Sequence, residues 1–193
     1  MSKVKHITRA AAYANHEDFC RIFNEDMNSL YLLALLLTAD REKAEQCFVS
    51  GLEDAAKGNP VFKEWARSWA RRTIIQNAVR RINPRPGDGS QGSSSASLDG
   101  NDETLPPERQ AQFDAVLGLE PFERFVYVMT VLERYSEYEC ALLLGAARRD
   151  VLAARTQALQ QLGSAMETHD RQLADVGSSV LELMVPRRLA TSA

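Results

Sequence analysis

A polar segment at residues 84–107 limits what this chain can fold into more than any other feature. It reads PRPGDGSQGSSSASLDGNDETLPP, rich in Gly, Ser, Asp and Pro and almost free of apolar side chains. Such a composition buries too little apolar surface to offset the entropy lost on ordering, so we expect a flexible, disordered linker. The sequence therefore predicts two small domains joined by a tether.

The residues before this linker carry three helical patterns and no strand-like alternation of useful length. We expect a first helix over about 16–38, where apolar residues recur along one face. A second helix should begin at Asp40, a suitable N-cap, and end before Gly58. A third should begin with Asn59 as its cap and Pro60 in its first turn, and end before Asn83 and the following proline. The first half is thus predicted to be all-α.

The third predicted helix is strongly basic, because its segment VFKEWARSWARRTIIQNAVRRI contains a single acid, Glu64. A solvated helix face usually mixes the two signs of charge, so we favour contact with nucleic-acid phosphates or another acidic partner over a solvated face. Trp65 and Trp69 lie four residues apart, and therefore on one face. We expect both in the core, although an aromatic ring beside a basic surface could also stack on an unpaired base.

The second half is also predicted to be helical, and it contains two helices joined by a glycine turn. Ser136 and Glu139 have the spacing of a capping box, Gly145 suits a left-handed turn, and a longer helical pattern runs from Arg148 to position 162. Such a helix-turn-helix can place its second helix in the major groove of DNA, but the same corner occurs in ordinary helical bundles. A further helical stretch at about 170–184 could pack back on this domain or contact a partner, and we expect it to pack back.

Composition narrows the function class. The net charge of −3 is not typical of a nucleic-acid binder. The prediction of nucleic-acid binding therefore depends on the local concentration of basic residues in single segments of the chain. Three scattered cysteines and three distant histidines indicate neither a disulfide framework nor a metal site. No signal peptide or membrane span is apparent, so we expect a cytoplasmic protein without membrane insertion. No catalytic constellation or phosphate loop is visible either, so we expect no enzyme and no cofactor.

The order of these parts resembles the bacterial RNA polymerase sigma factors of the extracytoplasmic-function (ECF) type. The resemblance covers most of residues 16–162: a helical domain ending in a basic, tryptophan-containing helix, a polar linker, the LxxxER segment that starts at Leu119, and a helix-turn-helix. In that family the first domain binds core RNA polymerase and the promoter −10 element, and the last helix of the second domain reads the −35 element. The resemblance therefore implies a transcription initiation factor without catalytic residues, whose partners are core RNA polymerase, promoter DNA and an anti-sigma factor.

The resemblance also assigns domains and contact residues. The expected division is 1–83 for the first domain, 84–107 for the linker, 108–169 for the helix-turn-helix domain and 170–193 for a C-terminal extension. Polymerase contacts are implied at Glu45, Gln46, Val49 and Ser50. Contacts of the basic helix with the −10 element are implied at Lys63, Trp65, Arg67, Arg71, Arg72, Gln76, Arg80 and Arg81. Contacts with the −35 element are implied at Arg148, Arg149, Arg155 and Gln157.

Some positions depart from the family pattern. Val49 and Ser50 replace a Gln-Glu pair, and Leu152, Ala153 and Ala154 stand where the recognition helix usually carries basic and polar residues. These departures favour a second hypothesis, a sigma-like interaction protein that binds an anti-sigma factor or another regulator without directing initiation.

Overall fold

The computed structural model describes the backbone of residues 12–87 and 107–184, and the side chains of 12–87 and 109–168. Within these ranges the regular structure is helical, apart from an isolated bridge between Tyr13 and Phe62, so the predicted all-α fold class is confirmed. Most of the predicted linker, residues 88–106, lies outside the described residues.

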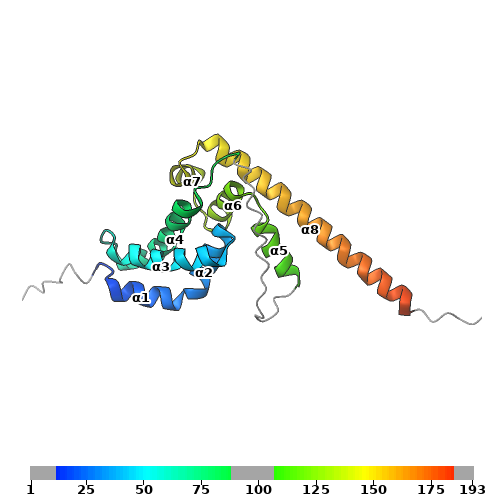
Figure 1. Cartoon of the computed structure of the whole chain (residues 1–193), viewed down its shortest axis with the longest axis horizontal. Coiled ribbons are helices and arrows are strands. Elements are labelled where there is room, and N and C mark those ends of the chain that lie inside the picture. The colour runs from blue at the N-terminus through cyan, green and yellow to red at the C-terminus, as the bar shows by residue number, and fades with distance from the viewer. Residues whose placement is uncertain (1–11, 88–106, 185–193) are drawn as a thin grey trace, which may run out of the picture.

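The N-terminal half is a bundle in which the apolar helix α2 lies between its neighbours (Figure 1). Its elements are α1 (His16–Glu25), α2 (Met27–Thr38), α3 (Arg41–Lys57), the 3₁₀ turn η2 (Lys63–Trp65) and α4 (Ala66–Ile82). Helix α2 packs against α3 and α4 within this half, and against α6 (Pro121–Tyr127) of the other half. Because α2 is covered on several sides, apolar residues occupy most of its circumference rather than one stripe.

The single helix predicted over 16–38 is wrong, because the chain turns at Asp26 and forms α1 and α2 instead. Asp26 has φ −101° and ψ 16°, outside helical geometry. The break leaves few backbone groups unpaired, since the Asp26 amide donates to the Ile22 carbonyl at 2.9 Å and the Leu30 amide donates to the Asp26 carbonyl at 2.9 Å. It lets the amphipathic α1 cover the surface of the bundle while α2 enters the core, a redirection that apolar periodicity does not reveal.

The predicted start of the basic helix is also wrong. Pro60 does not open a helix: the chain there is extended, and α4 begins only at Ala66, after η2. The extended segment pairs with the residues before α1, where the Ala14 amide donates to the Val61 carbonyl at 2.7 Å. The Tyr13 ring also stacks on Phe62, with ring centroids 4.6 Å apart. These long-range contacts outweigh the local Asn-Pro start signal.

Other predicted boundaries are confirmed. The Asp40 carboxylate caps α3 by accepting from the Lys43 amide at 3.0 Å. The basic helix ends where expected, because Asn83 adopts the left-handed conformation with φ 48°. In the second half Ser136 and Glu139 form the predicted capping box, and Gly145 has φ 62°.

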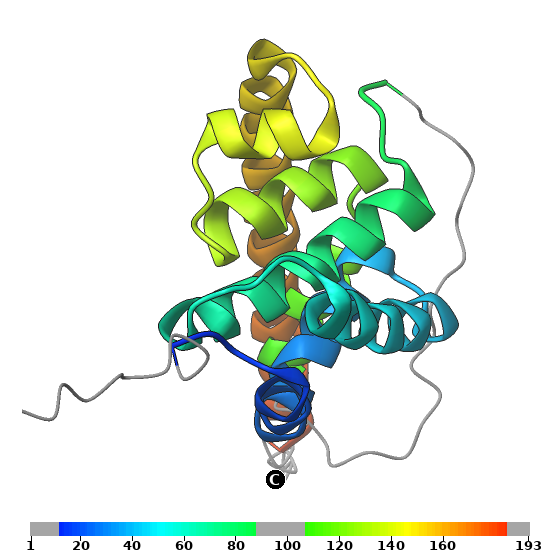
Figure 2. The same cartoon turned by 90° about the vertical axis from the view of Figure 1, so that its left-hand side faces the viewer.

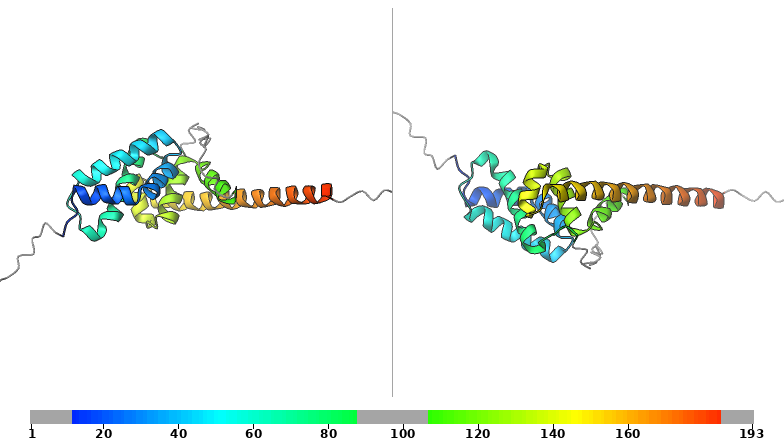
Figure 3. Two further views of the ribbon diagram at one scale, coloured as in Figure 1. Left: turned by 90° about the horizontal axis from the view of Figure 1, so that it is seen from below. Right: turned by 90° about the horizontal axis from the view of Figure 1, so that it is seen from above.

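The C-terminal half contains α5 (Pro107–Leu117), α6, the π-helical turn η3 (Val128–Leu132), α7 (Glu137–Leu144) and α8 (Arg148–Met184). The separate helix predicted over 170–184 is instead the continuation of α8. Gly163 does not interrupt the helix, because one interior glycine costs only about 1 kcal/mol. Figure 3 shows the later part of α8 extending away from the body of the molecule, so the expectation that this stretch packs back is wrong.

The two halves are in direct contact and share one cluster of buried apolar residues. Helix α6 packs against α2, and α7 lies against α4 (Figures 1 and 2). The buried Arg124 guanidinium, 5% exposed, joins the halves by donating to the carbonyls of Leu119 at 2.9 Å and Leu37 at 3.4 Å. Burial lowers the pKa of Arg124 to about 10, so the group stays charged at neutral pH. The predicted division of the chain into two domains and a C-terminal extension stays a prediction.

Candidate nucleic-acid interface

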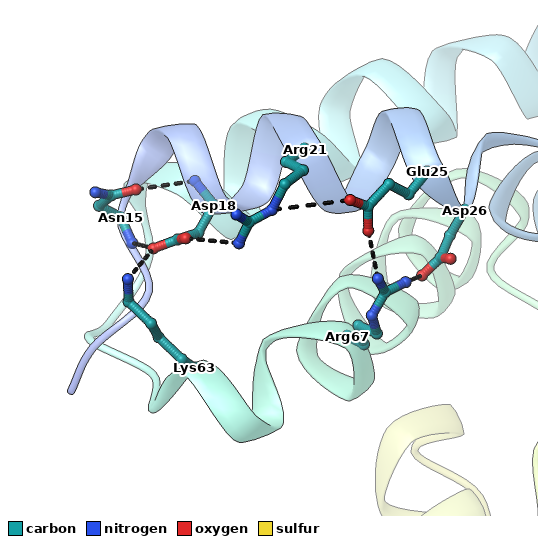
Figure 4. A network of polar contacts seen from close by, with 7 residues as sticks. All are labelled: Asn15, Asp18, Arg21, Glu25, Asp26, Lys63 and Arg67. Atoms are coloured by element: carbon teal, nitrogen blue, oxygen red, sulfur yellow. Dashed lines mark hydrogen bonds and ion pairs between the residues drawn. The ribbon is translucent and has the colours of Figure 1, made fainter. Parts of the chain in front are cut away.

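The N-terminal end of the basic segment is tied to acids of α1 (Figure 4). The Lys63 ammonium lies 3.0 Å from the Asp18 carboxylate, and the Arg67 guanidinium contacts both Glu25 and Asp26. Two hydrogen bonds lower the pKa of Asp18: the larger effect comes from the backbone amide of Asn15, the N-cap of α1, and the next from the Lys63 ammonium. The side chains of Lys63 and Arg67 remain about half exposed, at 47% and 55%. Both cations are therefore accessible but already paired.

The middle of α4 is tied to the other half of the chain. The Arg71 guanidinium donates from Nε to the Glu133 carboxylate at 2.6 Å, and its Nη2 contacts the second oxygen of the same carboxylate. Its Nη1 donates to the Ser29 hydroxyl at 2.8 Å. Glu133 lies just after η3, 62 positions further along the chain. This contact could not be predicted from the sequence, because neither residue has a local pattern that points to the other.

The C-terminal end of α4 lies against α3, where two sets of predicted contact residues meet. The Arg80 guanidinium contacts the Asp54 carboxylate, which also accepts from the Asn77 amide at 3.0 Å. Arg81 donates to the Gln46 side-chain oxygen at 2.8 Å and to the Ser50 hydroxyl at 3.0 Å. A residue predicted to bind the −10 element thus hydrogen-bonds two residues predicted to bind polymerase.

The other two residues of the predicted polymerase set lie on the same helix, and both face solvent. Glu45 is exposed and Val49 is 57% exposed. The four residues of this set therefore all lie on α3. Gln46 and Ser50 accept hydrogen bonds from Arg81, whereas Glu45 and Val49 have no side-chain hydrogen bond or ion pair within the described structure.

A groove of about 570 Å³ separates α4 from the turn between η3 and α7. Trp65, Trp69, Arg71 and Arg72 line it from the first half, and Glu133, Arg134, Tyr135 and Glu139 line it from the second. Trp65 is 61% exposed, so the expectation that it is a core residue is wrong. Trp69 is partly buried and packs against the core, as expected. The groove therefore has aromatic walls and charged groups of both signs.

Two polar positions of α4 form no ion pair or hydrogen bond with an acid among the described residues. Gln76 is half-buried, and Arg72 forms no ion pair with any carboxylate of the described residues. Hydrogen bonds from Ser136 lower the pKa of Glu139, and the charge of Arg72 lowers it further. Arg72 is thus the basic side chain of α4 with the least local compensation.

The first turns of α8 pack against α7. Val151 and Ala154 are buried against the body, which leaves the opposite face of the helix toward solvent. Arg148 lies 3.0 Å and Arg155 3.5 Å from the carboxylate of Glu137 in the first turn of α7, so both arginines lie on the flank of α8 that faces α7. Their side chains are 68% and 41% exposed.

The other two residues predicted to contact the −35 element, Arg149 and Gln157, are exposed to solvent. The Arg149 side chain is 88% exposed, more than those of Arg148 and Arg155, and among the described residues its ion pair is with the adjacent Asp150, at 3.4 Å. Gln157 is exposed as well. The structure therefore brings all four predicted −35 residues onto the first turns of one helix.

The predicted arginines form a surface whose charge is largely compensated within the molecule. An exposed ion pair contributes only about 0–1 kcal/mol, so a phosphate that offers the same geometry can replace an exposed carboxylate at little cost. The acids that compensate these arginines were missed at the level of sequence: Glu25, Asp26, Asp54, Glu133 and Glu137. They come from other helices or from the turns beside them, so only the packing brings them to the arginines.

Other kinds of site receive no support within the described ranges. No group of three or more His, Cys, Asp or Glu side chains there is placed to hold a metal ion. No described helix combines the length and apolar character needed to span a bilayer. A scan against models of known protein families and a search of curated proteins found no match to this chain.

Proposed function

We propose that the chain is a sigma factor of the extracytoplasmic-function type, which directs transcription initiation by binding core RNA polymerase and promoter DNA. The observation that carries the proposal is the pair α7 and α8: a helix with a capping box, a left-handed glycine and a second helix that presents arginines from its first turn. This is the arrangement a helix-turn-helix uses to place a helix N-terminus in the major groove.

Arg149 and Arg148 are the residues best suited to read the −35 element. An arginine fork can donate two hydrogen bonds to O6 and N7 of guanine, a contact that discriminates between bases by about 1–3 kcal/mol. Arg155, one to two turns further along α8, is suited to a phosphate. Binding requires the exchange of the exposed Glu137 ion pairs for DNA contacts, which costs little.

The basic face of α4 and the exposed residues of α3 would supply the other two contacts. Arg67, Arg72 and the aromatic Trp65 offer cations and a stacking ring for an unpaired −10 strand. Glu45 and Val49, which face solvent on α3, are suited to a protein partner such as the polymerase. No step in this role requires catalytic residues, because the chemistry belongs to the polymerase.

The proposal is tested by adding the purified chain to core polymerase and measuring specific initiation on a promoter library. We expect initiation that falls steeply with salt, because phosphate contacts release counterions. The triple variant R148A/R149A/R155A should reduce promoter binding by about 100-fold or more. A matched control is R41A/R85A/R109A, which removes the same charge from exposed positions outside the predicted sites. Equal loss in both variants, or no binding of core polymerase by the unmodified chain, would reject the proposal.

A second candidate is a sigma-like interaction protein that binds an anti-sigma factor or another regulator without directing initiation. It is favoured by hydrogen bonds within the molecule, since Arg81 already donates to both Gln46 and Ser50. Affinity capture with the tagged chain distinguishes the two: recovery of an anti-sigma protein without polymerase subunits supports this candidate, and tight promoter binding with polymerase rejects it.

A further inference from the structure

We infer that Glu133 is an internal competitor for the basic face of α4: its carboxylate occupies the Arg71 guanidinium, and an anionic strand must displace it to bind there. The inference rests on the proposed nucleic-acid role of α4 and adds its regulation, because the competing residue belongs to the other half of the chain.

The contact differs from every other ion pair of the predicted interface. Arg71 uses Nε and Nη2 on the two oxygens of one carboxylate, and its remaining Nη1 is held by Ser29 at 2.8 Å. The Glu133 side chain is only 9% exposed and that of Arg71 34%, whereas the side chains of Arg67 and Arg80 are 55% and 61% exposed. Shielding from water strengthens a two-point contact of this kind, because screening by solvent is reduced.

A phosphate and a carboxylate present the same pair of acceptors to an arginine fork, so they cannot occupy the same two donors of Arg71 together. Glu139 places a second carboxylate in the groove, which would repel a phosphate that approached Arg71 or Arg72. In the observed arrangement the middle of the basic face is therefore blocked by charge, while Arg67 and Arg80 near its ends remain accessible. Displacement of Glu133 would also remove a polar contact between the two halves.

Both tryptophans of the chain line this groove, which provides a spectroscopic signal at the site itself. Trp65 and Trp69 should both be quenched when a strand enters between α4 and the 133–139 turn. The experiment uses the full-length chain, a fluorescein-labelled single-stranded DNA 20-mer and its anisotropy, with tryptophan quenching measured on the unlabelled strand.

We expect E133Q, which keeps the side-chain shape and removes the charge, to bind the 20-mer about fivefold more tightly or better than the unmodified chain. The matched control is E53Q, the same change at an exposed glutamate of α3 whose ion pair within the described residues is with Lys57, and it should alter the dissociation constant less than twofold. Circular dichroism and thermal unfolding establish that each variant is folded.

Competition for one arginine is distinguished from general repulsion by a double-variant comparison. In the R71M background, the further change E133Q should give less than a twofold gain, because the donors for which Glu133 competes are gone. The charge-swapped R71E/E133R should restore the internal pair, with thermal stability close to that of the unmodified chain and weak DNA binding.

Three results would overturn the inference. Equal dissociation constants for the unmodified chain and E133Q would show that Glu133 does not compete. If E133Q tightened binding of the 20-mer as much in the R71M background as in the unmodified chain, Glu133 would act by general repulsion and not by competing for Arg71. Absence of DNA binding by every variant would instead reject the nucleic-acid role of α4, and the inference with it.

Discussion

Gly51 of α3 packs closely against Ile74 of α4, and its replacement by alanine tests how tightly these two helices pack. An added Cβ would lie 2.6 Å from Cδ1 and 3.4 Å from Cγ1 of Ile74, and 3.6 Å from the Ile74 Cα. Contacts below 3.0 Å do not persist, so Ile74 has to move. Ile74 is fully buried, χ1 of a β-branched side chain in a helix is essentially fixed, and the close-packed core leaves Cδ1 little room to rotate about χ2. The helices must therefore separate or the side chain must adopt a strained conformation.

The size of the effect follows from two opposing contributions. Overpacking a dense core typically costs about 1–3 kcal/mol, while replacing an interior helical glycine by alanine gains up to about 1 kcal/mol. We expect the overpacking to dominate, with a net loss of about 1–2 kcal/mol and a melting temperature lower by a few degrees. The matched control is Gly163→Ala in α8, where an added Cβ meets nothing within 4 Å. That change should stabilise the protein by up to about 1 kcal/mol.

The assay is urea unfolding of the full-length chain, followed by circular dichroism. The variant I74V removes the Cδ1 atom that causes the clash and should by itself cost about 1 kcal/mol. Because it also makes room for the new methyl group, G51A/I74V should be no less stable than I74V alone. Additive losses in the double variant, or a G51A protein as stable as the unmodified chain, would refute the close approach of the two helices at this point.

Three further predictions concern the cap, the buried arginine and the thiols. Ser136→Ala should cost about 1 kcal/mol at neutral pH. The hydrogen bonds from Ser136 lower the pKa of Glu139, so their contribution to stability is present above the ordinary carboxyl pKa and decreases as the pH falls through the lowered value. The loss of unfolding free energy caused by the substitution, measured by urea unfolding, should therefore shrink in acid. A pH-independent loss would contradict this prediction. Arg124→Lys keeps the charge but not the fork that reaches several carbonyls, and should lower the free energy of unfolding by about 1–2 kcal/mol; unchanged stability would mean that the fork is dispensable. Cys20 should react quickly with a thiol reagent at pH 8, while Cys47 and Cys140 stay unreactive until unfolding. Burial shields both thiols, raises the pKa of Cys47 and raises the pKa of Cys140 to about 12; fast reaction of more than one thiol would contradict this.

The local signals predicted much of the secondary structure. Asp40, the Ser136 and Glu139 pair, Gly145 and Asn83 all mark helix ends where the sequence predicted them. Each of these signals acts within one helical turn, through a side chain that satisfies a nearby amide or a residue that accepts a left-handed backbone. Such signals do not depend on the rest of the fold, and this is why they could be read without it.

The errors occurred where distant contacts overrode local preference. The break at Asp26 follows from the different destinations of α1 and α2, and the extended chain at Pro60 follows from its pairing with residues 12–14. The exposure of Trp65 has a related origin. Because α4 starts later than expected, Trp65 precedes the helix and does not lie on its buried face. Its ring packs beside that of Phe62, with the two ring centroids 5.6 Å apart.

By itself, the sequence determined the all-α class, most helix ends and the concentration of arginines in two helices, because all three are properties of neighbouring residues. Only the tertiary structure decided which acids meet those arginines. Glu133 reaches Arg71, and Arg124 reaches the carbonyl of Leu37, across the contact between the two halves. Ion pairs depend on distance in space rather than along the chain, and so the charge that each arginine presents to a partner is set by the packing.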